Sequence, residues 1–191
     1  DGPERWISSR GRPSFKCTGE PERILGLSMD VTERKRAEEQ ARQLSFAVEQ
    51  SPVSVVITDL EGKIIYVNRK FSALSGYSSE ECLGRNPRIL KSGECSAATY
   101  QELWSCITSG GTWRGRFQNR KKSGELYWEW AVISPLLDAT GKVSHFVGLK
   151  EDITEQERME AALRASEAHL AAGTELAGLG YYEVDYGEGT C

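Results

Sequence analysis

The clearest pattern in the chain is a set of short apolar runs separated by turn residues. Residues 53–59 (VSVVITD) form a run rich in Val and Ile, which is typical of a buried strand. A turn containing Gly62 follows, and residues 64–68 return as a second strand, so this segment predicts a hairpin. Three further strand-like runs come later, TWRGRFQNR, LYWEWAVISPLLD and VSHFVGLKEDI, joined by turns at Ser123-Gly124 and Thr140-Gly141.

Between the two groups of strands, the apolar positions change to helical spacing. Residues 69–77 predict one helix, and the sequence SSEE at 78–81 predicts a capping box that starts a second, shorter one. Residues 99–110 predict a third helix, with Thr99 and Glu102 as its capping pair. Two strands, several short helices and three strands predict an α+β domain with an antiparallel sheet on one side.

Two longer segments, 32–50 and 155–173, are rich in helix formers and predict linker helices. Their apolar positions follow the spacing of a coiled-coil seam. These positions are Ala37, Ala41, Leu44 and Val48 in the first segment and Met159, Leu163, Ser166 and Leu170 in the second. A lone solvated helix between domains and a two-chain coiled coil both fit this pattern.

The chain also repeats itself. Residues 1–40 align without a gap to residues 123–162, an offset of 122, and twelve of the forty positions are identical. Residues 177–185 resemble 51–59 in the same way, as the start of a third copy. The expected organisation is the C-terminal part of one domain (1–31), a linker helix (32–50), a complete domain (51–154), a second linker helix (155–173) and the start of a further domain (174–191).

Composition narrows the classes of function. The net charge of −4 argues against a nucleic-acid-binding surface, and no apolar run approaches the length of a membrane span, so we expect neither nucleic acid nor direct membrane contact. The five cysteines show no CxxC motif and no metal-ligand spacing, which is typical of reduced thiols in the cytosol. We therefore expect a cytoplasmic segment, whose parent protein could carry a membrane anchor elsewhere.

No residues form a catalytic pattern. The chain has no P-loop and no G-x-G-x-x-G motif after a strand, and no cluster with metal-ligand spacing. His145 lies in a predicted strand and His169 on a linker, and neither has the neighbours of a phospho-acceptor histidine. We expect no catalytic residues, no metal site and no enzyme activity in this segment.

Four stretches resemble the PAS sensory family: DVTE and DITE after the last strands, GYSSEECLG after the first helix, and NRKKSGELYWEW through the fourth strand. The resemblance implies a PAS fold, with a five-stranded antiparallel sheet, short helices on one face that enclose a pocket, and long flanking linker helices. It also implies a module that relays a ligand, redox or partner signal through the linker helices to an output domain, with a histidine kinase expected. The implied partners are a second copy of the chain in a parallel homodimer, adjacent PAS domains and that output domain.

Two alternatives stay open at this point. The segment could be a ligand-free PAS module that serves for dimerisation or as a spacer, with its sheets packed on partner PAS domains. It could also be the input segment of a cyclic-dinucleotide cyclase or phosphodiesterase, because the same residues would precede either output.

Asp30 and Thr32, and their repeats Asp152 and Thr154, mark the points where a strand passes into a helix. Each Asp has a Glu three residues further on, so the pattern predicts that the Asp caps the helix while the Glu reaches back. In the PAS family this Asp-x-Thr junction is associated with signal output. The four residues are therefore candidate signal-transmission residues.

The loop at 84–93 (GRNPRILKSG) resembles the flavin-binding loop of light-oxygen-voltage (LOV) domains, a branch of the PAS family. Asn86 and Arg88 match that loop, and in LOV domains the Arg faces the flavin phosphate. Asn119 matches an Asn that contacts the flavin. Pro87 stands in the place of the LOV cysteine, so adduct chemistry at this position is ruled out.

Two further positions depart from the LOV pattern. Glu129 stands where LOV domains carry a second Asn, and Lys150 where they carry a Gln that faces the flavin, so the two could pair or bind a charged small molecule. The cofactor therefore stays open between FAD or FMN, another ligand and none, with haem least favoured because His145 alternates away from the inner face. The candidate cofactor-binding residues are Asn86, Arg88, Trp113, Asn119, Glu129 and Lys150.

Overall fold

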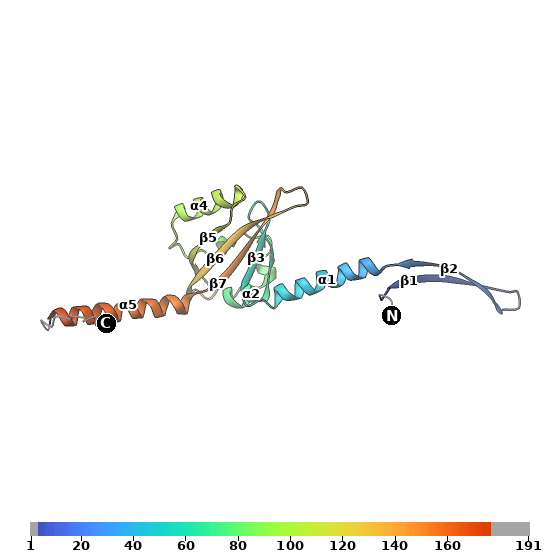
Figure 1. Ribbon diagram of the computed structural model, residues 1–191, viewed down its shortest axis with the longest axis horizontal. Coiled ribbons are helices and arrows are strands. Elements are labelled where there is room, and N and C mark those ends of the chain that lie inside the picture. The colour runs from blue at the N-terminus through green and yellow to red at the C-terminus, as the bar shows by residue number, and fades with distance from the viewer. Residues whose placement is uncertain (1–3, 177–191) are drawn as a thin grey trace, which may run out of the picture. The chain divides into compact units, whose positions relative to one another are not determined.

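The computed structural model describes residues 4–176, which form two units with a boundary between Ser51 and Pro52 (Figure 1). We describe each unit by itself. The expected start of a third domain, at 174–191, lies outside the described residues from position 177 onward.

The first unit is a hairpin followed by a helix. Strand β1 (Ile7–Phe15) pairs antiparallel with β2 (Pro21–Asp30), and α1 (Thr32–Glu49) follows. The register of this hairpin repeats that of two strands in the second unit. Ile7 lies opposite Asp30. Adding 122 to both numbers gives 129 and 152, which are also paired in the second unit.

The second unit contains a five-stranded antiparallel sheet in the order β4-β3-β7-β6-β5. Within this unit, β3 of the β3–β4 hairpin thus lies beside β7, the last strand, and the fold is the expected α+β arrangement. The strands are β3 (Ser54–Thr58), β4 (Ile64–Val67), β5 (Trp113–Arg120), β6 (Leu126–Leu137) and β7 (Val143–Asp152).

Short helices between β4 and β5 cover one face of this sheet. They are α2 (Arg69–Ser75), α3 (Ser79–Cys82), the 3₁₀ helix η1 (Pro87–Leu90) and α4 (Ala97–Thr108), and α5 (Thr154–Leu176) follows the last strand. The second linker helix thus runs three residues beyond the predicted end at 173. The capping box of α3 is present as predicted, with Ser78 and Glu81 each accepting the other's backbone N–H.

The predicted start of the third helix was wrong. Helix α4 begins at Ala97 rather than Thr99, because the hydroxyl of Ser96 accepts the backbone N–H of Thr99 at 3.2 Å and caps the first turn. Thr99 lies inside this turn, and its own hydroxyl is within 3.0 Å of the Ser96 hydroxyl. A serine three positions before the expected start therefore supplies the cap.

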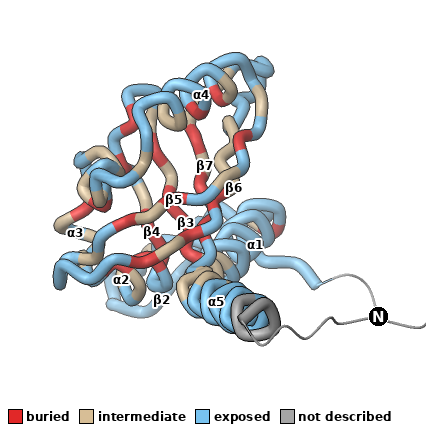
Figure 2. Tube along the Cα trace, turned by 90° about the vertical axis from the view of Figure 1, so that its left-hand side faces the viewer, coloured by how far each residue is buried: buried red, intermediate tan, exposed pale blue. Residues whose placement is uncertain are grey.

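The core lies between the inner face of the sheet and these helices, where Figure 2 shows the buried segments of the strands. One cluster packs under α2, α3 and η1, and a second packs under α4. Burial of each large apolar side chain contributes about 1.5–3 kcal/mol to folding. The first cluster consists of Val56, Ile64, Val67, Phe71, Cys82 and Leu90, and the second of Leu103, Ile107, Trp113, Phe117, Ala131 and Phe146.

Candidate ligand cavity and signal junction

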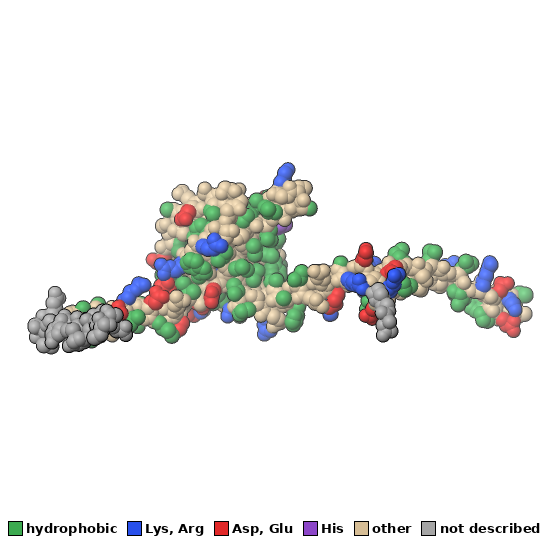
Figure 3. Space-filling model, viewed as in Figure 1, with side chains coloured by type: hydrophobic (Ala, Val, Ile, Leu, Met, Phe, Trp, Pro, Cys, Tyr) green, Lys and Arg blue, Asp and Glu red, His purple; other side chains and the backbone are tan. Residues whose placement is uncertain are grey.

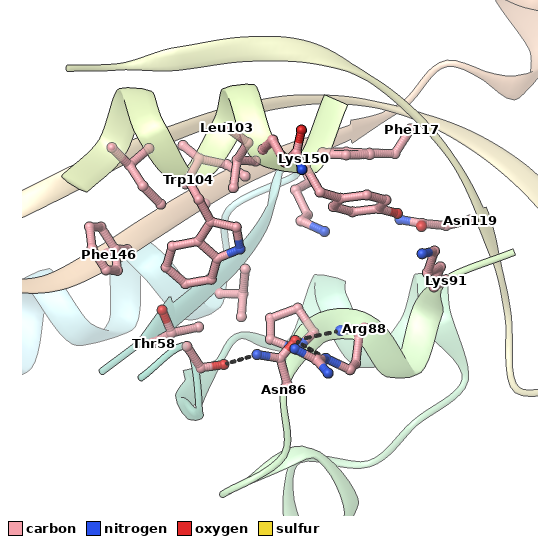
Figure 4. Close-up of a pocket in the computed structure, with 18 of the residues that line it drawn as sticks. Thr58, Asn86, Arg88, Lys91, Leu103, Trp104, Phe117, Asn119, Phe146 and Lys150 are labelled. Carbon is pink, nitrogen blue, oxygen red and sulfur yellow. Dashed lines mark hydrogen bonds between the residues drawn. The ribbon is translucent and has the colours of Figure 1, made fainter. Parts of the chain in front are cut away.

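A cavity of about 430 Å³ lies between the inner face of the sheet and the segment formed by η1 and α4 (Figure 4). Its apolar walls include Leu103 on α4, Phe117 on β5 and Phe146 on β7. The Trp104 ring packs edge-on against the Phe146 ring at 5.8 Å between centroids. A cavity of this size, with mostly apolar walls and a few polar groups, is typical of small-molecule sites.

The polar wall of the cavity is a hydrogen-bonded network on the sheet. Glu129 on β6 is 1% exposed, and Lys150 on β7 is 7% exposed. The Glu129 Oε1 atom accepts from Lys150 Nζ at 2.5 Å and from Asn119 Nδ2 at 2.7 Å. The second oxygen, Oε2, accepts from the Tyr127 hydroxyl at 3.2 Å. The predicted pairing of Glu129 with Lys150 is therefore present, and one carboxylate holds three donors.

This network shifts the titration of Tyr127. Burial raises the pKa of the Tyr127 hydroxyl well above its ordinary value, and the negative charge of Glu129 adds to the shift. Ionised tyrosine beside a buried carboxylate would place two negative charges together. Tyr127 is thus held as a neutral donor to Glu129.

The loop side of the cavity carries two cations. Asn86 fixes this loop, because its Nδ2 donates to the Gly62 carbonyl at 2.9 Å and its Oδ1 accepts from Arg88 Nε at 3.2 Å. Lys91 follows η1 and lies over the Tyr100 ring, with Nζ 4.7 Å from the ring centroid. Both Arg88 and Lys91 line the cavity.

Four of the six candidate cofactor residues line the cavity: Asn86, Arg88, Asn119 and Lys150. Glu129 does not line the cavity itself, but it accepts a hydrogen bond from Lys150, which does. Trp113 has a different place, because it packs in the core with its ring 4.9 Å from that of Phe117. A Cβ atom on Gly115 would lie only 2.4 Å from the Trp113 ring, so the glycine two residues after Trp113 leaves room for this ring.

Sequence reasoning missed three residues of the site: Lys91, Tyr100 and Tyr127. Tyr127 lies two residues before Glu129 on the same strand, so the period of two could have placed it on the inner face. Lys91 and Tyr100 come together only because the loop after η1 folds back on α4, and no local pattern signals that contact.

The polar wall departs from the LOV pattern at two positions. Glu129 and Lys150 stand where LOV domains carry amides, and they pair with each other at 2.5 Å. One N–H of the Asn119 amide also donates to Glu129, whose carboxylate accepts from three donors. Within residues 4–176, no histidine or cysteine lines the cavity, so its described walls offer no imidazole or thiolate to haem iron.

The junction between strand and helix has the same geometry in both units. In the second unit, Asp152 Oδ1 accepts from the backbone N–H of Thr154 at 2.9 Å and from its hydroxyl at 2.5 Å. The Thr154 hydroxyl in turn accepts from the backbone N–H of Trp128 on β6 at 2.9 Å. Thr154 therefore joins the last strand, the neighbouring strand and the first turn of α5.

The first unit repeats these contacts. Asp30 Oδ1 accepts from the Thr32 N–H at 2.9 Å, and the Thr32 hydroxyl accepts from the Trp6 N–H at 2.8 Å. Hydrogen bonds from Thr32 hold the pKa of the Asp30 carboxyl below its ordinary value. The predicted reach-back by a glutamate was wrong for α1, because its N-cap is Val31, which makes no side-chain cap, and Asp30 lies one residue further out.

No helix within residues 4–176 combines the length and apolar character needed to cross a membrane. In the same part of the chain, no group of three or more His, Cys, Asp or Glu side chains is arranged to hold a metal ion.

An antiparallel sheet that closes a cavity with short helices, and whose last strand passes directly into a helix, defines a sensory α+β domain. Residues 52–155 match the family model of the PAS domain, and the chain belongs to this family. PAS domains are sensory modules without catalytic activity of their own, and the complete domain here is one of them.

Comparison with known proteins agrees with this assignment. The chain is 35% identical over 117 residues to a nitrogen fixation regulatory protein of Klebsiella oxytoca, covering 61% of this chain and 24% of that protein. It is 31% identical over 152 residues to a blue-light-activated histidine kinase of Rhizobium johnstonii, covering 78% and 44%. The first relative is thus about four times as long as the matched part.

The fold also matches a solved LOV domain of an Erythrobacter litoralis blue-light-activated histidine kinase. The TM-score is 0.52 at 30% identity, and the match covers 55% of this chain and 99% of that domain. The homology to signal-transducing regulators and histidine kinases identifies the complete domain as a sensory one.

Proposed function

We propose that the complete PAS domain binds a ligand in its cavity and relays occupancy through α5 to a downstream output domain, with a histidine kinase as the expected output. One observation carries this proposal. Lys150 lines the cavity, and only two residues further along β7 the Asp152 carboxylate holds the first turn of α5. A change at Lys150 therefore has a short, hydrogen-bonded route to the helix.

The polar wall extends that route to the neighbouring strand. Glu129, the partner of Lys150, is paired across the ladder with Asp152, and Trp128 beside it donates to Thr154. An ion pair further links Arg116 on β5 to Glu157 in the first turns of α5, with 2.6 Å between Nη1 and Oε1. Three strands thus contact the start of the helix.

A fused reporter tests the relay. The chain is joined in helical phase, through α5, to the catalytic part of a histidine kinase, and autophosphorylation is measured. The double change Glu129→Gln with Lys150→Met should alter the activity by at least about three-fold, and Asp152→Ala should remove that response. Asp138→Ala is the matched control, because Asp138 holds Thr140 by the same two hydrogen bonds in a turn far from α5.

If the effects of the double cavity change and of Asp152→Ala on autophosphorylation simply add, the proposal is contradicted. Two sites on one relay route must instead show non-additive effects. A response that Asp138→Ala removes equally well would also contradict it. Helix content and cooperative thermal unfolding should be retained in each variant, so that a lost response reports lost coupling.

A ligand-free dimerisation module is the second candidate, and one observation favours it. The outer face of the sheet exposes large apolar side chains, which Figure 3 shows over the strands of the domain. They include Ile65, Trp130 and Leu149. A partner PAS domain packed on this face would bury them, and dimerisation that persists when the cavity is blocked would support this role. We place both roles in the cytoplasm.

A further inference from the structure

We infer that the cavity selects a small anionic molecule, one that carries a carboxylate, sulfonate or phosphate group on a flat apolar body. This inference rests on the proposed function and names the chemical class of its ligand. It follows from the balance of charge around the cavity, from the unused donors of Lys150 and Arg88, and from the aromatic walls.

The charges that line the cavity all have one sign. Among the described residues, the lining side chains include Arg88, Lys91 and Lys150 and no aspartate or glutamate. Glu129, behind the wall, offsets one of these three charges. A net excess of two positive charges remains. It belongs to Arg88 and Lys91, which are exposed at the loop side of the cavity, so they attract an anionic ligand with a strength that falls as the salt concentration rises.

Lys150 has donors to spare. An ammonium group has three N–H donors, and in the described part of the chain its single hydrogen-bond acceptor is Glu129 Oε1. The carboxylate of Glu129 is shared with Asn119 and Tyr127, so it cannot take up the rest. Figure 4 shows the Lys150 side chain directed into the cavity, where a ligand oxygen would satisfy the remaining donors.

The loop cations are also available. Neither Arg88 nor Lys91 has a carboxylate oxygen within 4.0 Å among residues 4–176. Arg88 uses Nε to reach Asn86, which orients the guanidinium and leaves its two terminal nitrogens for a ligand. A planar guanidinium suits a two-oxygen anionic group.

The remaining walls fit a flat apolar body. Tyr100 and Phe117 stack with 5.7 Å between centroids, and Trp104 meets Phe146 edge-on at the other side of the cavity. The volume of about 430 Å³ limits the ligand to a small molecule of a few fused or linked rings. An aromatic acid thus matches both the charge and the shape.

Two dyes that differ in a single group provide the test. Anilinonaphthalene sulfonate carries a sulfonate, and N-phenylnaphthylamine is the same skeleton without it, and both fluoresce when they enter apolar sites. The anionic dye should bind the chain at least about ten-fold more tightly than the neutral one. Its affinity should fall as the salt concentration rises.

Variants assign the effect to residues. Arg88→Gln and Lys91→Gln should each raise the Kd of the anionic dye about three- to five-fold, and the double variant about ten-fold or more. Neither should change the Kd of the neutral dye. Arg85→Gln is the matched control, because Arg85 is exposed in the same loop but does not line the cavity.

A further pair of variants locates the dye. Ala97 lines the cavity at the start of α4, whereas Ala98 beside it is exposed and does not line it. Ala97→Trp should reduce binding of both dyes, and Ala98→Trp should not. Binding that survives Ala97→Trp would place the anionic dye on the exposed sheet face and overturn the inference.

The dye results test the anionic class of the ligand and the ligand-based function separately. Equal affinity for both dyes, or anionic affinity unchanged by Arg88→Gln with Lys91→Gln, would overturn the anionic class while leaving a ligand cavity in place. If neither dye enters the cavity, the inference and the ligand-based function fail together, and the dimerisation module is favoured.

Discussion

Glu129 and Lys150 form an ion pair in the interior of the domain. Each side chain is more than nine-tenths buried, and taking either charge out of water costs several kcal/mol. Three donors compensate the carboxylate, so its charge is well satisfied. The lysine is compensated once, and a ligand anion would complete its hydrogen bonds.

We expect Lys150→Met to lower the free energy of unfolding by about 3–5 kcal/mol, because the change leaves the Glu129 charge buried without its counter-ion. Adding Glu129→Leu should restore most of that loss, since no charge then remains to be solvated. Urea denaturation of the chain, followed by tryptophan fluorescence, gives both values.

Lys70→Met serves as the control, because Lys70 is exposed on α2 and its loss should change stability by less than about 0.5 kcal/mol. A loss below about 1 kcal/mol for Lys150→Met would mean that water reaches the pair. In that case the carboxylate would not need the lysine.

Tyr127 makes stability depend on alkaline pH. Its folded pKa is raised above the unfolded value of about 10, so the neutral hydroxyl stabilises the fold below that pH. The contribution is lost as the pH rises above about 10, because the unfolded state then releases a proton that the folded state keeps. Tyr127→Phe should therefore reduce the fall in unfolding free energy between about pH 9 and pH 11.

Tyr100 does not confound this comparison. Burial also raises its pKa, but Tyr100 is present in both proteins, so its contribution cancels in the difference. Equal slopes of unfolding free energy against pH in wild type and Tyr127→Phe would show that Tyr127 titrates alike in both states.

At the scale of elements, the apolar pattern was sufficient for the sheet. The β3–β4 hairpin and the turns at Ser123-Gly124 and Thr140-Gly141 follow from short apolar, strand-like runs that end at turn residues. The inward side of β7 was predicted from the resemblance to LOV domains together with strand alternation, and Phe146, Gly148 and Lys150 are the buried residues of this strand.

Contacts between elements were less predictable. The sequence could not show whether Trp113 lines the cavity or packs in the core, because a Trp in a strand fits either position. The Trp113 ring packs against Gly115, which has no side chain to exclude it. The start of α4 depended on which of two hydroxyls, Ser96 or Thr99, faces the free N–H groups. Sequence spacing allowed either, and the backbone path of the preceding loop decided it.

The cap of α4 gives a direct test at this scale. Ser96→Ala should lower the free energy of unfolding by about 1 kcal/mol, because the Thr99 N–H loses its acceptor. Thr99→Ala should cost less than half as much, since Thr99 lies within the helix, where alanine has the higher propensity. Chemical denaturation of both variants compares them, and the reverse order would show that the helix starts at Thr99.

At the scale of the whole molecule, the chain holds the same strand-to-helix junction twice. The two junctions share their pairing register and their hydrogen bonds, at an offset of 122 residues. A signal carried by one helix would thus enter the next domain at its first strand, since β3 begins five residues after α1 ends. Relay through successive domains requires that each linker helix keeps a defined rotation about its own axis.

A parallel dimer would set that rotation, and the helices carry a seam for it. Leu44 on α1 is 62% exposed, and Met159 and Leu163 on α5 are 62% and 60% exposed. Isolated helices of this length are marginal in water, so burial of the seam between two chains would stabilise them. The lone-helix alternative leaves these side chains in solvent.

Single cysteines distinguish the two arrangements. In a background with Cys17→Ser, Cys95→Ser, Cys106→Ser and Cys191→Ser, which keeps only the buried Cys82, Leu163→Cys should form an interchain disulfide rapidly under mild oxidation, because a parallel in-register dimer places residue 163 opposite its own copy. Ala168→Cys is the control, since position 168 lies on the side of the helix away from the seam and is exposed. Non-reducing electrophoresis separates the products. Equal cross-linking at both positions would indicate random collision. No cross-linking at Leu163→Cys would leave α5 a solvated helix whose rotation is set within its own chain, by the Asp152 junction and the Arg116–Glu157 ion pair.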